Sequence, residues 1–228
     1  YFANDNKSLM YKMQKRDKII FELFFGKYLT DYIVKKATAI IAPTWVYKSA
    51  YEWTGKTSKL IPFACDESRI GIPFCIKEGE PIKIFHGWQK GKEYRKGNDV
   101  FDRVIKKVVL KYGNKVEYQI VQGVPFEEYQ KMYSECHIYI DQLYAHDKAT
   151  SGMYGMAAGK IVFAGFEEES LQEYPHYKGE EIGIPSSMDE DILYKQFCDL
   201  IDDPRRIERI SKNAIEFVMA NHASRKVA

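Results

Sequence analysis

Two segments of the chain carry residue types that suit binding of an anion. The first, "HGWQKGKEYRKGND", sets basic side chains among glycines just before a helical pattern begins. Its basic residues and glycines are Lys90, Lys92, Arg95, Lys96, Gly87, Gly91 and Gly97. Such a loop running into a helix N-terminus is typical of a phosphate cradle, although a charged run is also the usual composition of a solvated loop. The loop matches neither GxGxxG nor GxxxxGK[ST], which disfavours a dinucleotide site or a P-loop NTPase.

The second segment is "AHDKATSGMYGMAAGK", which follows a short apolar stretch. We expect Thr150 or Ser151 to cap a helix here, and Gly152 to leave its first turn bare. Backbone N–H groups and the helix dipole would then attract a phosphate. Close packing on a sheet explains the later small residues well, and Thr150 to Gly152 less well. The sequence therefore predicts a diphosphate between the amides near Ser151 and the ammonium of Lys96.

Other polar residues lie close to these two segments. Asp141 ends a buried strand, where polar groups point into the ligand crevice of a parallel sheet. His146 and Asp147 are in the following loop and are candidates for ligand contact, although a single histidine in a loop is more often solvated. The crevice contains no DxD motif, and "DED" at 189–191 begins a helix. We therefore predict no metal and no cofactor.

Strand and helix patterns alternate through most of the chain, which indicates a doubly wound α/β fold with a parallel sheet. The expected strands cover 82–87, 115–122, 137–142, 160–165 and 181–185. The expected helices cover 98–113, with Asn98 as its cap and Gly113 as its stop, then 125–136, 150–159, and two between 188 and 221. The loops 86–98, 122–125, 141–151 and 165–170 would meet at the carboxyl ends of the strands.

The first part of the chain is less complete. A helix is expected over 7–37 with a bend near Gly26, a strand over 38–43, a helix from Thr44 to Gly55, and a strand over 58–64. These elements cannot cover both faces of a sheet. We therefore expect residues 1–62 to be the remnant of a second α/β domain, 63–81 to be a linker, and 82–228 to be the complete domain. The chain is expected to be a piece of a longer protein.

Composition restricts the partners and the compartment. Lys plus Arg number 34 and Asp plus Glu number 32, so the net charge of +2 does not favour nucleic acid. The four cysteines form no CxxC pair, and no signal peptide is evident, which fits a cytoplasmic protein with reduced thiols. The basic aromatic stretch 11–32 could contact the inner face of a membrane peripherally, or it could pack on a core.

Several segments resemble the C-terminal half of GT-B fold glycosyltransferases of the large "group 1" retaining class. They are "ATAIIAP", "LIPFACDESRI", "RKGNDVF", "IVQGVPFEEYQKMYSECHIYIDQL", "GMAAGKIVFAG" and "NAIEFVMANHASRKVA", spread over residues 37–228. In that family this half binds a nucleotide-sugar donor, and the other half binds the acceptor.

The resemblance implies roles for particular residues. Lys96, supported by Arg95 or Lys90, would hold the donor diphosphate, and Thr150, Ser151 and Gly152 would present the helix N-terminus to it. Further donor contacts are implied at Gly87, Gln122, Gly123, Val124, Asp141, His146 and Tyr154. The residues Gln122 to Val124 would border the nucleotide base. Neutralising the departing diphosphate would be the main catalytic contribution, without a metal.

The chain departs from the family at sugar- and ribose-binding positions. His146 and Tyr154 stand where the family has a pair of glutamates, and Asp147–Lys148–Ala149 replaces a Gly-x-Gly. Trp88 stands where an arginine is common. The leading hypothesis is a hexosyltransferase acting on a glycan or lipid-linked acceptor in bacterial surface polysaccharide synthesis, with this piece alone transferring nothing. The alternative is a non-catalytic module that binds a nucleotide sugar or a protein; an epimerase or phosphorylase finds no specific support.

Overall fold

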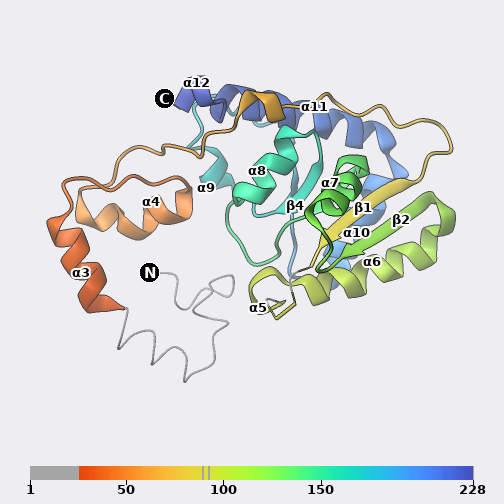
Figure 1. Cartoon of the computed structure of the whole chain (residues 1–228), viewed down its shortest axis with the longest axis horizontal. Helices are drawn as coiled ribbons and strands as arrows, with labels where there is room; N and C mark the ends of the chain where they lie inside the picture. The colour runs from red at the N-terminus through yellow and green to blue at the C-terminus, as the bar shows by residue number, and fades with distance from the viewer. Residues whose placement is uncertain (1–25, 89, 92, 228) are drawn as a thin grey trace.

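The structure, a computed structural model, describes residues 26–88, 90–91 and 93–227. A five-stranded parallel sheet forms its centre, with the strand order β2-β1-β3-β4-β5 (Figure 1). The strands are β1 (Ile82–Gly87), β2 (Val116–Val121), β3 (Ile138–Ile140), β4 (Ile161–Ala164) and β5 (Ile184–Pro185). The chain leaves β1 toward β2 on one side and returns to place β3 on the other. This change of direction confirms the predicted doubly wound α/β fold.

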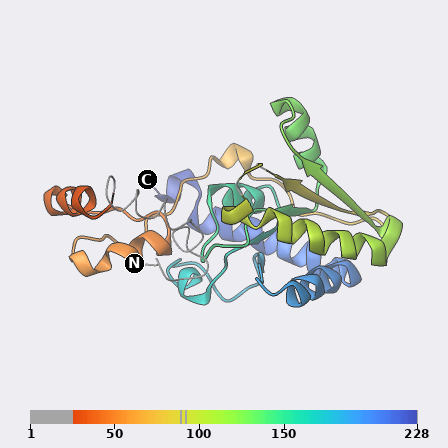
Figure 2. The ribbon, with the colours of Figure 1, turned by 90° about the horizontal axis from the view of Figure 1, so that it is seen from below.

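Helices cover both faces of the sheet (Figures 1 and 2). Those of the sheet domain are α5 (Glu93–Lys96), α6 (Asn98–Tyr112), α7 (Phe126–Glu135), α8 (Thr150–Ala157), α9 (Glu168–Leu171), α10 (Glu190–Asp202), α11 (Pro204–Asn221) and α12 (Ser224–Val227). A 3-10 turn, Gly113–Lys115, leads into β2. The helices α5, α9 and α12 are short, and the sequence pattern did not predict them.

One face of the sheet packs on α6 and α10. The buried residues of α6 recur at helical spacing, so that Phe101, Val104 and Val108 face isoleucines of β1 and β3. On β4, Phe163 stacks on Phe197 of α10 with ring centroids 4.2 Å apart. Burying apolar side chains of this size contributes about 1.5–3 kcal/mol each, so this face is a principal source of stability.

The opposite face packs on α7 and α8, with the C-terminal half of α11 covering α8. Phe85 and Val162 point to this side, where Met153, Met156 and Phe217 are buried. Alternate residues of β1 and β4 therefore enter opposite cores, because side chains alternate across a strand. Both faces being covered explains why the central strands are apolar almost throughout.

The N-terminal part lies to one side of the sheet domain and contains α3 (Lys27–Lys36), α4 (Trp45–Tyr51) and a 3-10 turn, Glu52–Thr54. The predicted helix over 7–37 is thus confirmed for 27–36, and residues 1–25 lie outside the described residues. The strands predicted over 38–43 and 58–64 are wrong. One isolated bridge, Ile40 to Thr57, links the two regions. Pro43 and Pro62 lack the N–H groups that a longer ladder would need.

Residues 63–81 run in extended form along α8 and α11, with one 3-10 turn at Glu67–Arg69. The segment is fixed to the sheet domain by hydrogen bonds: Gly71 N–H donates to Ala157 O at 2.9 Å, and Phe74 N–H to Ser211 Oγ at 3.2 Å. Near the start of the segment, Cys65 and Ala223 form an isolated parallel β-bridge through their backbones. It therefore packs as part of the sheet domain along most of its length.

The start of α6 differs from prediction. Gly97, with φ +68°, is the cap residue of α6, and Asn98 is the first residue of the helix. The Asn98 side chain is turned inward, where its Oδ1 lies 3.3 Å from His86 Nε2. A side chain added to Gly97 would meet Leu143 at 2.6 Å, so only glycine fits here. The predicted stops at Gly55 and Gly113 are both cap residues with positive φ.

Candidate functional site

The carboxyl ends of β1 and β3 are neighbours at the point where the strand order reverses, which is where doubly wound sheets bind ligands. The loop after β1 contains α5, and the loop after β3 leads into α8. A backbone hydrogen bond from Leu143 N–H to Lys96 O, 2.9 Å long, joins these two loops. The topology therefore brings together the two segments that the sequence singled out.

Lys96 and Ser151 converge on one carboxylate. The Lys96 ammonium lies 3.2 Å from Asp141 Oδ1, and Ser151 Oγ donates a hydrogen bond to the same oxygen at 2.7 Å. The convergence of Lys96 with the start of α8 was predicted. The expectation of an open space between them is wrong, because the Asp141 side chain occupies it.

The helix cap was also predicted incorrectly. Ala149 is the cap residue of α8 and makes no side-chain capping bond. Thr150 and Ser151 lie within the first turn, and Ser151 uses its hydroxyl on Asp141 instead of the helix backbone. The helix dipole stabilises a carboxylate near a helix N-terminus, so Asp141 interacts favourably with the N-terminus of α8.

The glycines of α8 have different neighbours. A Cβ on Gly152 would lie 2.9 Å from Asp141 Oδ2, so this glycine admits the carboxylate of the chain itself. A Cβ on Gly155 would lie 2.8 Å from Val162 Cγ2 and 3.1 Å from the Tyr139 ring. Gly155 therefore lets α8 press on the sheet, as predicted, and its packing role outweighs its helix cost of about 1 kcal/mol.

A groove with a volume of about 440 Å³ runs between α7 and α8 and is bordered by residues 69 and 71 of the extended segment. Its lining includes Tyr129, Tyr133, Ser151, Tyr154 and Arg69. The rings of Tyr129 and Tyr133 stack, with centroids 6.2 Å apart. The Arg69 guanidinium lies 4.8 Å from the centroid of the Tyr154 ring. The groove thus offers aromatic faces and the Arg69 guanidinium, while the other lining cation, Lys160, donates to the backbone oxygens of Ser134 and Cys136.

The sequence reasoning identified Tyr154 and Ser151 but missed the other groove residues. Tyr129 and Tyr133 are four residues apart on α7, a spacing that places them on one helix face. That signal was available, whereas the position of Arg69 was not. Burial raises the pKa of the Tyr129 and Tyr133 hydroxyls, so both stay protonated and can donate hydrogen bonds.

His86 at the end of β1 is buried between aromatic and polar neighbours. Its Nδ1 lies 2.7 Å from the Tyr118 hydroxyl, and its ring stacks on Trp88 with centroids 5.6 Å apart. Burial lowers the pKa of His86 to about 4. In the neutral tautomer with its proton on Nε2, the ring donates to Asn98 Oδ1 and can accept from the Tyr118 hydroxyl at Nδ1. His86 supports the base of the loop after β1.

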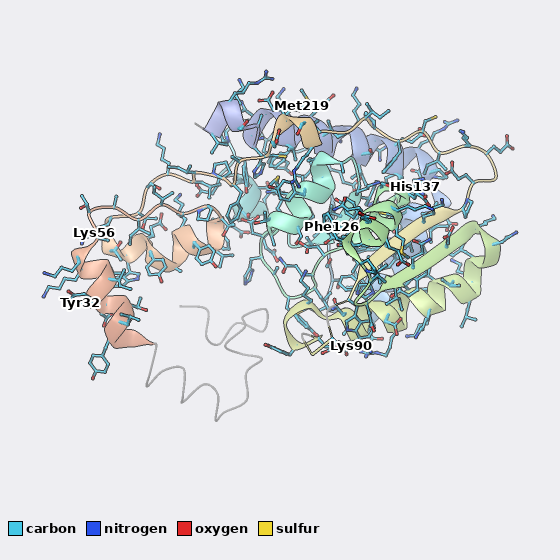
Figure 3. The ribbon with its side chains drawn as sticks, viewed as in Figure 1. Tyr32, Lys56, Lys90, Phe126, His137 and Met219 are labelled. Atoms are coloured by element: carbon cyan, nitrogen blue, oxygen red, sulfur yellow. The ribbon has the colours of Figure 1, made fainter. Side chains whose placement is uncertain are left out.

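The remaining predicted site residues are more scattered. Lys90 is exposed on the surface turn before α5 (Figure 3). Gly87 ends β1, where a Cβ would lie 3.3 Å from the Tyr129 hydroxyl. The structure describes the backbone of Arg95 within α5. Gln122, Gly123 and Val124 follow the edge strand β2, with Gly123 at φ +64°.

His146 and Asp147 contact the N-terminal part of the chain. The His146 ring meets Trp45 of α4 edge-on, with centroids 6.0 Å apart, and His146 Nδ1 lies 3.9 Å from Glu167. Asp147 Oδ2 accepts a hydrogen bond from the Trp45 N–H. These two residues therefore belong to the contact with α4 and lie outside the Lys96–Asp141–Ser151 cluster.

Within the described residues, no three His, Cys, Asp or Glu side chains are grouped so that they could hold a metal ion. None of the helices there is long and apolar enough to cross a bilayer.

Sequence comparison finds no relative: no family model and no curated protein matches the chain. Solved structures do match. Anabaena HepE in complex with UDP superposes with a TM-score of 0.62 at 10% identity, covering 96% of this chain and 67% of HepE. TarM of S. aureus, solved with UDP among its ligands, gives 0.62 at 13% identity over 88% of this chain and 45% of TarM. Sucrose-phosphate synthase from Thermosynechococcus elongatus superposes with a TM-score of 0.58 at 16% identity, covering 96% of this chain and 61% of the synthase.

These comparisons define the class of fold. The chain has the fold of the C-terminal half of GT-B glycosyltransferases, which confirms the resemblance seen in the sequence. HepE has also been solved with UDP-glucose, and with UDP and glucose. The structural neighbours of this chain are thus glycosyltransferases, several of which were solved with UDP or a UDP-sugar.

Proposed function

We propose that this chain is the donor-binding part of a hexosyltransferase that transfers a sugar from a nucleotide sugar. The observation that carries the proposal is the groove between α7 and α8, which reaches Ser151 at the switch point of the sheet. The nucleoside would lie among the tyrosines and the diphosphate at the start of α8.

Residue roles follow from these positions. Tyr154 would contact the ribose, and Gln122 to Val124 would border the base from the end of β2. Lys96 and Arg95 would bind the diphosphate, with Lys90 and the Thr150–Ser151–Gly152 turn as further contacts. The Tyr154 hydroxyl offers a neutral hydrogen bond at the position where the family has a glutamate, so ribose binding would be weaker than in other members.

The transfer itself needs little covalent chemistry from this half. The bond between the anomeric carbon and the diphosphate breaks, and its electron pair leaves with the diphosphate. A bond to an acceptor hydroxyl forms, and that hydroxyl loses its proton. The Lys96 ammonium would offset the charge that develops on the leaving group. We propose retention of configuration and no metal, in keeping with the family that the chain resembles.

The test is direct titration of UDP into the chain by calorimetry. We expect Lys96→Ala to weaken binding about tenfold, because a charge-assisted contact to phosphate is lost. Lys107→Ala is the matched control, since Lys107 is an exposed lysine on α6 that pairs with Glu190. Equal affinity in all three proteins would refute the assignment of Lys96. No binding of UDP, GDP or ADP at millimolar concentration would refute the donor site as a whole.

We further propose that the acceptor is a glycan or a lipid-linked glycan at a membrane, as in bacterial surface polysaccharide synthesis. Supporting this, α3 exposes Tyr28, Leu29, Tyr32 and Ile33, and it ends in Lys35 and Lys36. In Figure 3 the Tyr32 side chain points away from the rest of the molecule. Aromatic and basic residues together suit contact with an anionic lipid surface. Co-sedimentation with vesicles containing phosphatidylglycerol should fall in a Tyr28→Ser/Tyr32→Ser variant.

A second candidate function is a non-catalytic module on the same fold. It is favoured by the pairing of Lys96 with Asp141 and by Tyr154 in place of a carboxylate. A module that binds a protein would bind UDP with no dependence on Lys96, or would not bind it at all. The titration with Lys96→Ala therefore separates the donor site from a protein-binding module, and a sugar-transfer assay separates it from a module that binds a nucleotide sugar without catalysis.

A further inference from the structure

The carboxylate of Asp141 lies where an anion bound to α8 would be expected. Its side chain is 0% exposed, and Oδ1 carries both the Lys96 and the Ser151 contacts. Oδ2 is buried and has no hydrogen-bond partner among the described residues. It faces Gly152, where an added Cβ would be 2.9 Å away. Asp141 is thus a buried carboxylate at the N-terminus of α8, and one of its two oxygens lacks a hydrogen bond.

Lys96 supplies the countercharge for Asp141 and remains accessible. Burying a carboxylate costs several kcal/mol unless a cation and hydrogen bonds compensate it. The Lys96 side chain is 27% exposed, so its ammonium can be reached from solvent. Its backbone is held by the bond from Leu143 N–H, so the side chain can change partner while α5 stays in place.

From this arrangement we propose that Asp141 is an internal competitor for Lys96 that determines which ligands bind. A ligand must take the ammonium from Asp141 and accept the proximity of a buried negative charge. A nucleoside diphosphate carries enough negative charge to displace Asp141 from Lys96. A nucleoside monophosphate carries less charge and interacts more weakly with the ammonium. The inference rests on the donor site proposed above and adds a threshold for contact with Lys96, which a diphosphate passes and a monophosphate does not.

The proposal is tested by calorimetric titration of UDP and UMP into four proteins: wild type, Asp141→Asn, Lys96→Ala and the double variant. Asp141→Asn should bind UDP about tenfold more tightly, because it frees Lys96 and removes a repulsive charge. The gain for UMP should be smaller, because UMP carries less negative charge for Asp141 to repel and does not displace Asp141 in the wild type, so the preference for UDP over UMP should widen. In the Lys96→Ala background, Asp141→Asn should raise the affinity for UDP by less than about threefold, because most of its effect depends on the release of Lys96.

The control is Asp199→Asn, which removes one negative charge from an exposed pair with Lys195 on α10. It should leave both affinities unchanged. If Asp141→Asn fails to fold, the wild type gives a second measurement by ¹⁵N spectroscopy of its lysine ammonium groups. The signal that is missing in Lys96→Arg should shift when UDP binds and stay in place when UMP is added at equal concentration.

The outcomes separate the two proposals. UDP binding by the wild type with equal or weaker binding by Asp141→Asn would overturn this inference and leave the donor site intact. An unmoved Lys96 signal during UDP binding would overturn it in the same way. No UDP binding by either protein would overturn the donor site, and the inference with it.

Discussion

Asp147 joins the loop before α8 to the N-terminal part of the chain through Trp45. Its Oδ2 accepts a hydrogen bond of 3.2 Å from the Trp45 N–H at the start of α4, across 102 positions in the sequence. Its Oδ1 lies 3.7 Å from the ammonium of Lys148, which is buried over the Tyr174 ring at 4.0 Å. The Asp147 carboxylate thus accepts a hydrogen bond at the start of α4 and also lies beside the buried ammonium of Lys148.

Asp147→Ala should lower the free energy of unfolding by about 3–5 kcal/mol, because it leaves Lys148 buried without its countercharge. Urea denaturation followed by circular dichroism measures this. Lys148→Met added to Asp147→Ala should recover a large part of the loss, since it removes the stranded charge at similar volume. If the double variant is no more stable than Asp147→Ala alone, the buried charge is not the cause.

Gly155→Ala should lower the free energy of unfolding by about 1–3 kcal/mol, although alanine is the better helix former. The new methyl group would lie 2.8 Å from Val162 Cγ2. Val162→Ala opens space at the same point, so the two substitutions together should cost less than the sum of their separate effects. Additive losses in thermal or urea unfolding would show that the contact with Val162 is not limiting.

Arg69→Ala should weaken UDP binding about threefold to tenfold and leave pyrophosphate binding unchanged, because Arg69 lies on the nucleoside side of the groove. Calorimetric titration of the two ligands gives the comparison. Arg225→Ala is the control, since Arg225 pairs with Glu67 of the same 3-10 turn as Arg69 but does not line the groove. Parallel losses for UDP and pyrophosphate would place Arg69 at the phosphates instead.

Acid should destabilise the protein through its buried histidines before most carboxylates titrate. Burial lowers the pKa of His222 to about 3 and that of His86 to about 4, and it also lowers the pKa of His137. The unfolded chain takes up these protons near pH 6.5, whereas the folded chain resists them. Their contribution to stability is therefore full above pH 6.5 and is lost as the pH falls toward 4.

Each such histidine should reduce the free energy of unfolding by about 1.4 kcal/mol per pH unit within that window. Urea unfolding between pH 8 and 5 measures the slope, and His222→Gln should make it shallower. Above pH 7.5 the curves of the two proteins should run parallel, because neither state binds the proton there. An unchanged slope in His222→Gln between pH 6.5 and 5 would contradict the assignment.

The regular part of the fold was predictable because its elements carry strong local signals. The strand 82–87 is largely buried between Pro81 and Gly87, the strand 116–121 alternates polar with β-branched or aromatic residues, and α6 shows a complete helical repeat of buried residues. Strands whose pairing depends on residues far away in the sequence were harder to predict. Residues 38–43 have a strand-like composition, but pairing depends on neighbouring strands, which the described N-terminal part does not provide.

The sequence by itself determined the doubly wound order of strands and helices and the two loops that carry the anion-binding residues. Only the tertiary structure decided how those loops use them. Asp141, Lys96 and Ser151 meet because β3 lies beside β1, and this pairing fills the expected ligand space with a carboxylate. Arg69 reaches the groove because the extended segment folds back along α8. Local composition cannot encode such contacts, since they depend on which surfaces the packed core leaves side by side.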